Sequence, residues 1–261
     1  MPEIPRGRFV WYELLTTDPE GAEAFYGSLM GWGTDEWQAP VEDMPPYRMW
    51  TVDGTSIGGI MELPEEARQG GAPPHWLGHI ATPDADATAA RAEELGATVL
   101  MGPHSIPEVG RFAVIRDPWG ATFSAYTPAG EAPGHEGEPK VGEVVWHELL
   151  TEDYAGAADF YGDLFGWTRG EPMDMGEMGI YQIVERNGVQ LGGIMNRPPE
   201  WPSSWLYYVR VDDLDGKIEA VRSTGGKILN GPMEVPGGGR IAQGLDPQGG
   251  AFAIFEAGEM G

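Results

Sequence analysis

An internal repeat constrains this chain more than any other feature of its sequence. Residues 11–32 (WYELLTTDPEGAEAFYGSLMGW) and residues 146–167 (WHELLTEDYAGAADFYGDLFGW) are identical at 14 of 22 positions, at a constant offset of 135. Three further pairs match in the same order along the chain: YRMWTVDGTSIGGIM with YQIVERNGVQLGGIM, GPHSIPEVGR with GPMEVPGGGR, and DPWGATF with DPQGGAF. Such extended self-similarity predicts two copies of one folded unit in tandem.

The boundary between the two copies is expected in a segment with no hydrophobic periodicity. Residues 127–140 (TPAGEAPGHEGEPK) are rich in Pro, Gly and charge, which is typical of a linker. We therefore expect an N-terminal domain over residues 1–128, a linker over 129–140 and a C-terminal domain over 141–261. A chain of 261 residues with 41% hydrophobic content has room for two conventional cores.

Each half contains a second, fainter repetition of a strand, an Asp, a helix and further strands. Residues 8–15 alternate as a strand does; Asp18 then provides a helix N-cap, Pro19 a first helical position and Gly31 a helix end. A second pass runs from residue 76 to 96, with a counterpart from 205 to 225. The pattern predicts an α+β chain of four modules.

The helix ends FYGSLMGW and FYGDLFGW and the strand starts DP-x-G-x-x-F carry a resemblance to a known family. The chain resembles the glyoxalase/bleomycin resistance/dioxygenase superfamily, also called vicinal oxygen chelate, and within it the tandem two-domain glyoxalase-like subgroup. The resemblance covers the chain outside the linker. It implies that each domain consists of two βαβββ modules, which form a cupped mixed sheet around a cavity.

In the metal-dependent members, the resemblance places ligands on the first strand of each module and on the last strand. These positions hold the following residues here: Trp11, His79, Ser124, Trp146, Tyr208 and Ala253. Only His79 is an ordinary metal ligand, because an indole or an alanine cannot bind a metal ion. We therefore expect no metal and no other cofactor. A metal-dependent glyoxalase or dioxygenase with relocated ligands stays open as an alternative.

Two glutamates are candidates for catalysis without a metal. Glu13 and Glu148 each follow a tryptophan by two residues, so strand alternation places each carboxylate on the face of that tryptophan. A desolvated carboxylate has a raised pKa and suits a general base in enolisation, isomerisation or water addition. His79, His147 or a tyrosine is the candidate acid. The alternative is a structural glutamate that pairs with an arginine or with backbone amides.

The candidates for contacting a substrate are mostly aromatic: Trp11, Tyr47, Trp146, Tyr181 and Tyr208. Arg111 and Arg240 end the two GP-x6-GR stretches, where a Gly/Pro-rich loop is expected to enter a strand. Such a loop can fold over a cavity mouth and clamp a carboxylate, phosphate or enolate; an ordinary salt bridge is the alternative. Four tryptophans outside the helical stripes are candidates for a ligand wall or for interface packing: Trp37, Trp50, Trp119 and Trp201.

Composition narrows the partners. The formal charge of −25, with 41 acidic and 16 basic residues, disfavours nucleic acid and anionic membranes. The chain has no cysteine, which excludes disulfides and thiolate sites. It shows neither a signal-peptide order nor an apolar run of about 18 residues, so we expect a cytoplasmic protein. The expected partner is a small molecule, bound by a monomer with an internal pseudo-dimer or by a homodimer.

These observations predict a metal-independent protein that binds an aromatic or polyketide-like compound. As an enzyme it would be lyase-, isomerase- or hydroxylase-like and would use a cavity glutamate. As a non-catalytic protein it would sequester a drug or toxin, in the manner of bleomycin-resistance proteins, and would need no acid or base.

Overall fold

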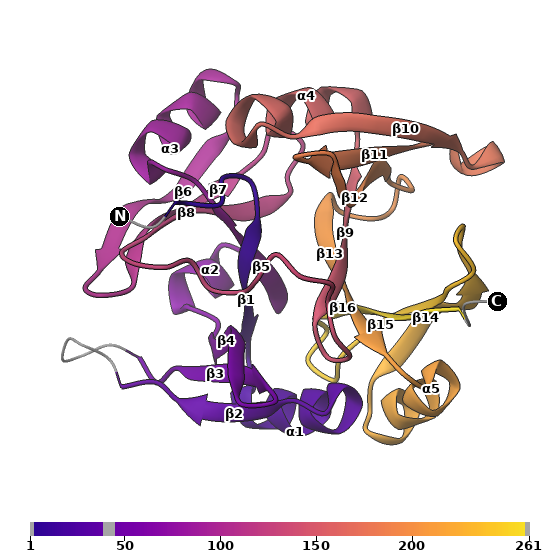
Figure 1. The fold of residues 1–261 in the computed structure, drawn as a ribbon. Coiled ribbons are helices and arrows are strands. Elements are labelled where there is room, and N and C mark those ends of the chain that lie inside the picture. The colour runs from indigo at the N-terminus through magenta and orange to yellow at the C-terminus, as the bar shows by residue number, and fades with distance from the viewer. Residues whose placement is uncertain (1–2, 39–44, 259–261) are drawn as a thin grey trace. The chain divides into compact units, whose positions relative to one another are not determined.

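The computed structural model describes residues 3–38 and 45–258, and it contains the four expected modules (Figure 1). Each module is a strand, a helix and three further strands. The first module comprises β1 (Phe9–Thr16), α1 (Pro19–Met30), β2 (Gly33–Glu36), β3 (Arg48–Val52) and β4 (Thr55–Glu62). After a short α2 (Glu65–Gln69), the second comprises β5 (His75–Ala81), α3 (Ala85–Glu94), β6 (Thr98–Ile106), β7 (Gly110–Arg116) and β8 (Thr122–Pro128).

The second half of the chain repeats this order. Its third module comprises β9 (Val144–Thr151), α4 (Tyr154–Phe165), β10 (Thr168–Asp174), β11 (Ile180–Arg186) and β12 (Val189–Asn196), with a 3-10 turn at Gly176–Met178. The fourth comprises β13 (Ser204–Val211), α5 (Leu214–Ser223), β14 (Lys227–Glu234), β15 (Arg240–Leu245) and β16 (Ala251–Glu256). The fold is therefore α+β, as the repeat predicts.

The strands form two eight-stranded mixed sheets with the same order. The first sheet runs β2-β3-β4-β1-β5-β8-β7-β6, and the second runs β10-β11-β12-β9-β13-β16-β15-β14. In all four modules the last strand pairs parallel with the first: β1 with β4, β5 with β8, β9 with β12 and β13 with β16. The helices α3, α4 and α5 pack on the three later strands of their own modules.

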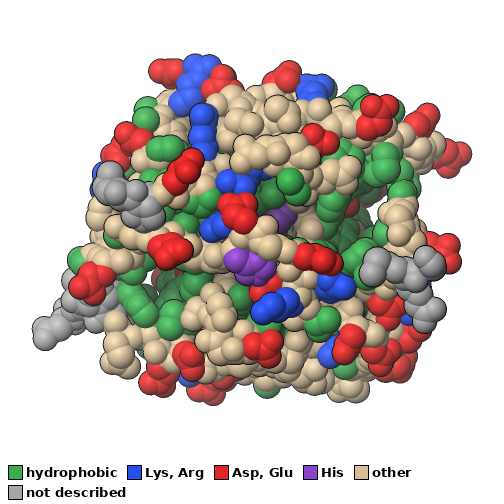
Figure 2. Space-filling view, viewed as in Figure 1, with side chains coloured by type: hydrophobic (Ala, Val, Ile, Leu, Met, Phe, Trp, Pro, Cys, Tyr) green, Lys and Arg blue, Asp and Glu red, His purple; other side chains and the backbone are tan. Residues whose placement is uncertain are grey.

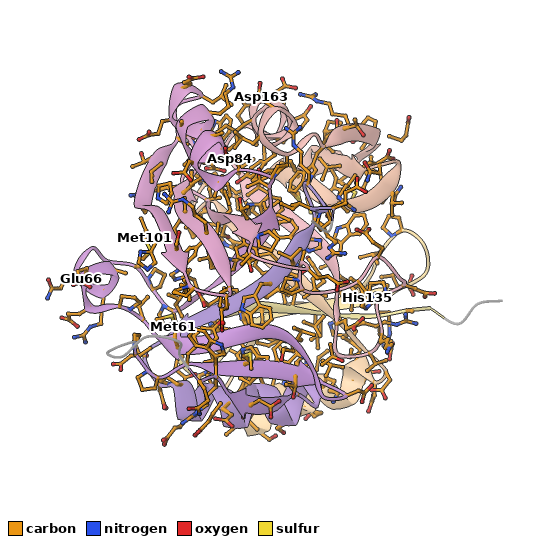
Figure 3. All side chains as sticks on the ribbon, turned by 60° about the vertical axis from the view of Figure 1, so that its left-hand side comes forward. Met61, Glu66, Asp84, Met101, His135 and Asp163 are labelled. Carbon is orange, nitrogen blue, oxygen red and sulfur yellow. The ribbon has the colours of Figure 1, made fainter. Side chains whose placement is uncertain are left out.

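All four module helices begin in the same way. Their N-caps are Asp18, Asp84, Asp153 and Asp213, and each carboxylate accepts a hydrogen bond from the backbone N–H three residues later. Figure 3 labels Asp84 at the start of α3. Because the Asp–helix pattern recurs in the sequence, all four helix starts are predictable from it.

By their internal contacts, the segments group into two compact units that each combine parts of both halves. One unit holds the chain up to Trp11 with Leu77–Pro133 and Trp146–Trp205. The other holds Tyr12–Trp76, Gly134–Val145 and the chain from Leu206 onward. The expected linker at residues 129–140 separates the two copies of the sequence repeat, but the two units do not follow that separation. A domain boundary there stays a prediction.

A buried hydrogen-bonded chain closes the core of the second unit. The indole nitrogen of Trp76 donates to the Tyr26 hydroxyl at 3.1 Å, and that hydroxyl donates to Asp246 at 2.9 Å. The other carboxylate oxygen of Asp246 accepts the backbone N–H groups of Gln248 and Gly250. Burial raises the pKa of Asp246 and, more strongly, that of Tyr26.

The first unit contains the same arrangement with the two halves exchanged. Trp205 donates to the Tyr161 hydroxyl at 3.0 Å, and Tyr161 donates to Asp117 at 3.1 Å. The Tyr of each FYG helix end therefore meets the Asp of the other half's DP-x-G turn. We call these two hydrogen-bonded chains the Tyr–Asp clasps.

The tryptophan that ends each FYG segment also reaches the other half. Trp32 donates to the carbonyl of Gly142 at 2.7 Å, and Trp167 donates to that of Gly7 at 2.7 Å. Gly7 has a φ of 77°, and a Cβ added there would lie 2.7 Å from the carbonyl oxygen of Phe165. Only glycine fits this position without displacing its neighbours.

One expectation about local structure is wrong. The GP-x6-GR stretches do not begin as loops over a cavity mouth: Gly102 and Pro103 lie inside β6, and Gly231 and Pro232 lie inside β14. Both strands are at the edge of their sheets and pair with irregular register, which is where a strand tolerates proline. Gly237–Gly239 lie in the loop that joins β14 to β15.

Acidic side chains are dispersed over the displayed surface (Figure 2), and the helices of the described residues are short. Figure 2 shows Asp and Glu side chains spread over the displayed face rather than gathered in one patch. The longest helices, α1 and α4, have 12 residues each, and none in the described part of the chain is long and apolar enough to cross a bilayer.

Candidate functional site

Strand β9 presents two different faces. His147 packs toward the aromatic core, with its ring stacked on Phe9 at a centroid distance of 4.1 Å. Trp146 and Glu148 alternate with it and therefore project from the opposite face. On this second face Glu148 is the register partner of Gly193 in β12.

Three side chains of the first unit form a hydrogen-bonded chain on that face. The indole nitrogen of Trp146 donates to the Tyr181 hydroxyl at 2.7 Å, and the Tyr181 hydroxyl donates to Oε2 of Glu148 at 3.1 Å. Glu148 is 8% exposed and Tyr181 7%. We call this group the Glu148 cluster.

The glycine pair in the segment LGGIM makes room for the Glu148 cluster. The Tyr181 ring lies against Gly193, where an added Cβ would be 1.9 Å from the ring. A Cβ added at the preceding Gly192 would lie 1.9 Å from the carbonyl oxygen of His147. A side chain at either position would push the tyrosine or the neighbouring strand away.

The cluster keeps the tyrosine protonated. Burial, followed by the charge of Glu148, raises the pKa of Tyr181 well above its ordinary value. Tyr181 is thus a hydrogen-bond donor at neutral pH, and Glu148 is the acceptor that it holds in place. A fixed, nearly buried carboxylate can accept a proton from a bound molecule.

His147 does not suit the role of acid that the sequence left open for it. Burial lowers the pKa of His147 to about 4, so the imidazole is neutral at pH 7. Its Nδ1 lies 2.8 Å from the carbonyl oxygen of Leu191. The ring belongs to the core face of β9, opposite Glu148.

His79 lies on β5 in the first unit and is the register partner of Ser124 on β8. Its ring contacts Phe112 and Tyr126 edge-on, both at 6.1 Å between centroids. Burial raises the pKa of Tyr126 to about 12, and its hydroxyl donates to the carbonyl of Val109. His79 is buried among these rings and is 8% exposed.

In the second unit, Glu13 and Tyr47 repeat part of the arrangement. Glu13 is half-buried and is the register partner of Gly59 in β4. The Tyr47 hydroxyl lies over Gly59, 1.8 Å from where a Cβ would be. The ring of Trp37 meets that of Tyr47 edge-on at 5.6 Å between centroids.

Tyr208 belongs to a polar chain that the sequence reading missed. Gln243 donates to the Tyr208 hydroxyl at 2.6 Å, and Asn230 donates to Gln243 at 3.2 Å. At the repeat offset of 129 set by Gly102 and Gly231, Gln243 and Asn230 correspond to Val114 and Met101. Two positions that are apolar in the first half are therefore polar in the second half. This difference between the repeats is the sequence signal that indicates the hydrogen-bonded chain.

The two arginines form ordinary ion pairs, the second of the two interpretations above. Arg111 holds Asp86 of α3, with Nη2 2.7 Å from Oδ1, and Arg240 holds Glu256 at 2.6 Å and Asp215 of α5 at 3.0 Å. The Asp86 contact raises the pKa of Arg111. Both guanidinium groups therefore tie a strand to the helix of its own module.

The tryptophans outside the helical stripes differ in availability. Trp50 is 1% exposed and packs in the core of the second unit, so it is not a ligand wall. Trp11 is half-buried on β1 and Trp37 is half-buried after β2.

A small cavity of about 20 Å³ lies in the second unit, with room for about one water molecule. It is lined by Tyr12, Tyr26, Met30, Trp32, Trp76, Val144, Tyr207, Val209 and Phe252.

The side chains do not fit a metal ion of the kind the fold family implies. Across residues 3–38 and 45–258, no three or more His, Cys, Asp or Glu side chains are grouped so that they could hold one. Trp11 and Trp146 stand at two of the expected ligand positions, and indole supplies no ligand atom. Relocated ligands find no support within this part of the chain.

Comparison with known sequences identifies a family. The description "Glyoxalase/Bleomycin resistance protein/Dioxygenase superfamily" matches residues 8–124 and again residues 141–254. The Mycobacterium tuberculosis protein named "Putative glyoxylase CFP32" is 33% identical over 97% of this chain and 96% of its own length. "Anthracycline biosynthesis protein DnrV" of Streptomyces peucetius is 30% identical over 98% of this chain and 95% of its own.

Solved structures with low sequence identity share the fold. The 2,2',3-trihydroxybiphenyl 1,2-dioxygenase of Sphingomonas wittichii strain RW1 aligns with a TM-score of 0.67 at 12% identity, covering 98% of this chain and 91% of that one. A Mn(II)-bound glyoxalase of Novosphingobium aromaticivorans aligns with a TM-score of 0.64 at 16% identity, covering 97% and 83%. The paired-module architecture over the whole chain is thereby shared with both.

Proposed function

This chain belongs to the Glyoxalase/Bleomycin resistance protein/Dioxygenase superfamily, and we propose that it binds a planar aromatic small molecule and moves a proton on it, with Glu148 as the base. The observation that carries the proposal is the Glu148 cluster. In it a carboxylate that is 8% exposed is hydrogen-bonded to a buried tyrosine hydroxyl at 3.1 Å, which fixes its position beside two aromatic rings.

The residues of the cluster have separate roles in this proposal. Glu148 takes a proton from a carbon next to an aryl carbonyl: the C–H bond breaks, its electron pair forms the enolate, and the proton goes to the carboxylate. Return of the proton to the same or another carbon completes an exchange or an isomerisation, without an oxidant or a metal. Tyr181 orients Glu148 and remains protonated, and Trp146 orients Tyr181.

The aromatic nature of the ligand rests on two kinds of support. Trp146 and Tyr181 place flat rings at the carboxylate. Two relatives are named for anthracycline biosynthesis, DnrV of Streptomyces peucetius and DauV of Streptomyces sp. strain C5, each matching 98% of this chain. A neutral, planar, hydroxylated or keto-substituted aromatic compound is the class of ligand we propose.

The base can be tested with 1-tetralone, a small aryl ketone that has exchangeable hydrogens beside its carbonyl. In D2O, the protein should accelerate deuterium uptake into 1-tetralone, measured by mass spectrometry. Glu148→Gln keeps the size of the side chain but cannot accept the proton, so the catalysed rate should fall by about a hundredfold. Tyr181→Phe should lower the rate less, because it only releases Glu148 from its orientation.

The matched control is Glu171→Gln, which removes an exposed carboxylate from β10 in the same half and should leave the rate unchanged. A wild-type rate equal to that of buffer would contradict the base. If 1-tetralone or 1,4-dihydroxyanthraquinone then still raises the melting temperature, and Glu148→Gln does not change that increase, the chain is a sequestering protein.

A further inference from the structure

We infer that the first half carries a second site of the same kind, built from Glu13, Tyr47 and Trp37, so that one chain takes two molecules of the aromatic ligand. The inference rests on the proposed function for the class of ligand. It goes beyond that function in the number of sites and in their unequal openness.

The geometry around Glu13 is set by strand register in the second unit. Glu13 on β1 pairs with Gly59 on β4, and Gly59 pairs on its other side with Met49 on β3. Tyr47 precedes Met49 by two residues, and its hydroxyl lies 1.8 Å from the Cβ position of Gly59. The tyrosine ring thus folds across the glycine toward the strand that carries Glu13.

The Glu148 cluster has the same register, residue for residue. Glu148 on β9 pairs with Gly193 on β12, Gly193 pairs with Ile183 on β11, and Tyr181 precedes Ile183 by two residues. Here the ring lies 1.9 Å from the Cβ position of Gly193, and its hydroxyl bonds Glu148 at 3.1 Å.

Equal register has a direct consequence for Glu13. Register partners on neighbouring strands project from the same face, and the strands are about 4.8 Å apart. A tyrosine hydroxyl that sits over Gly59 therefore lies beside the side chain of Glu13, as the Tyr181 hydroxyl lies beside Glu148. The sequence repeat has preserved both the carboxylate and the glycine that gives the tyrosine its place.

The two sites differ in their surroundings. Glu13, Tyr47 and Trp37 are all half-buried, whereas Glu148 and Tyr181 are 8% and 7% exposed. In the Glu13 site the tyrosine packs edge-on against Trp37, and the backbone N–H of Trp37 donates to the carbonyl of Tyr47 at 3.2 Å. The Glu13 site is the more open of the two, with an indole at its side that a flat ligand can cover.

The number of sites can be counted with 1,4-dihydroxyanthraquinone as the probe, titrated against the whole chain by calorimetry and tryptophan fluorescence. Wild type should bind close to two molecules. Gly59→Ala introduces a Cβ where the Tyr47 hydroxyl lies, and Gly193→Ala introduces one against the Tyr181 ring. Each variant should bind about one molecule, and the double variant none.

Two further variants keep the test decisive if either alanine variant fails to fold. Tyr47→Leu removes the phenol without filling Gly59 and should also reduce the stoichiometry to one. Trp37→Phe should remove the fluorescence quenching caused by the molecule bound at the Glu13 site. Calorimetry should still count two bound molecules per chain. Glu20→Gln, an exposed carboxylate of α1, is the control and should behave as wild type.

The outcomes separate this inference from the proposed function. One outcome would overturn the Glu13 site and preserve the Glu148 site. In it, wild type binds one molecule, Gly193→Ala abolishes that binding, and Gly59→Ala and Tyr47→Leu leave it unchanged. A complete absence of binding to wild type would overturn the proposed aromatic ligand and the second site together.

Discussion

At the scale of single residues, the matching positions His147 and Tyr12 show how a duplicated site diverges. His147 is 6% exposed, stacked on Phe9, and hydrogen-bonded through Nδ1 to the carbonyl of Leu191. Tyr12 packs edge-on against Tyr207 at 5.3 Å between centroids. His147 is buried in the core of its unit, whereas Tyr12 is half-buried and lines the small cavity of the other unit. Strand alternation places each on the face opposite its neighbouring glutamate.

The burial of His147 predicts a pH dependence of stability. Burial lowers the pKa of His147 from 6.5 to about 4, so unfolding at mildly acidic pH is coupled to proton uptake. The contribution is fully present above about pH 6.5 and is lost as the pH falls toward 4; it amounts to about 3 kcal/mol of unfolding free energy.

His147→Phe should therefore lose less unfolding free energy than wild type between pH 7.5 and pH 4.5, by about 2 kcal/mol or more, in urea titrations at both values. Its absolute stability at pH 7.5 should be lower, since the bond to Leu191 is gone. His104→Phe, at an exposed position, should keep the wild-type dependence. Parallel curves for His147→Phe and wild type would mean that His147 is not the titrating group.

At the scale of secondary-structure elements, the sequence predicts most of what the structure contains. Helix starts follow from an aspartate whose short side chain caps backbone N–H groups, and strand faces follow from alternation. The edge strands β6 and β14 were not predictable in the same way. Their Gly-Pro pairs indicate a loop locally, and only the place of these strands at the end of each sheet makes proline acceptable.

The candidate site was predictable in part, for a physical reason. Glu148 and Trp146 share a face through local alternation, which the sequence shows directly. The bond from Tyr181 to Glu148 spans 33 residues, and the bond from Gln243 to Tyr208 spans 35. Such contacts depend on strand order and register, which no local pattern determines.

The cap of α3 offers a test at this scale. Asp84 accepts a hydrogen bond from the backbone N–H of Ala87 at 3.0 Å, and α3 ties β6, β7 and β8 together. Asp84→Ala should lower the unfolding free energy by about 1 kcal/mol, measured by urea denaturation. Asp84→Ser keeps a capping oxygen and should restore most of that loss; equal losses in both variants would argue against capping as the cause.

At the scale of the whole molecule, the Tyr–Asp clasps join the halves in both directions. Tyr26 from the first half bonds Asp246 from the second, and Tyr161 from the second bonds Asp117 from the first. The indole bonds of Trp32 to Gly142 and of Trp167 to Gly7 cross between the halves as well. We therefore expect the halves to unfold together, although the repeat makes them look like separable domains.

Cutting the linker tests this expectation. Residues 134–138 are exposed, so a protease recognition sequence inserted between Glu136 and Gly137 should be cleaved in the folded chain. The two fragments should then elute as one species in size-exclusion chromatography and separate only in denaturant. Independent elution of the fragments under native conditions would show that the clasps do not hold the halves together.

The clasps also bear on how a chain of this kind arises. Each is the counterpart of the other under the repeat, so every residue type needed for both contacts is present within a single half. This is the reciprocity of a two-fold symmetric homodimer, in which one surface complements itself. A protein of half this length would have had to find its partner at the concentration the cell provides. Fusion of two copies makes the same pairing independent of concentration, which leaves each copy free to change its own ligand contacts while the other preserves the assembly.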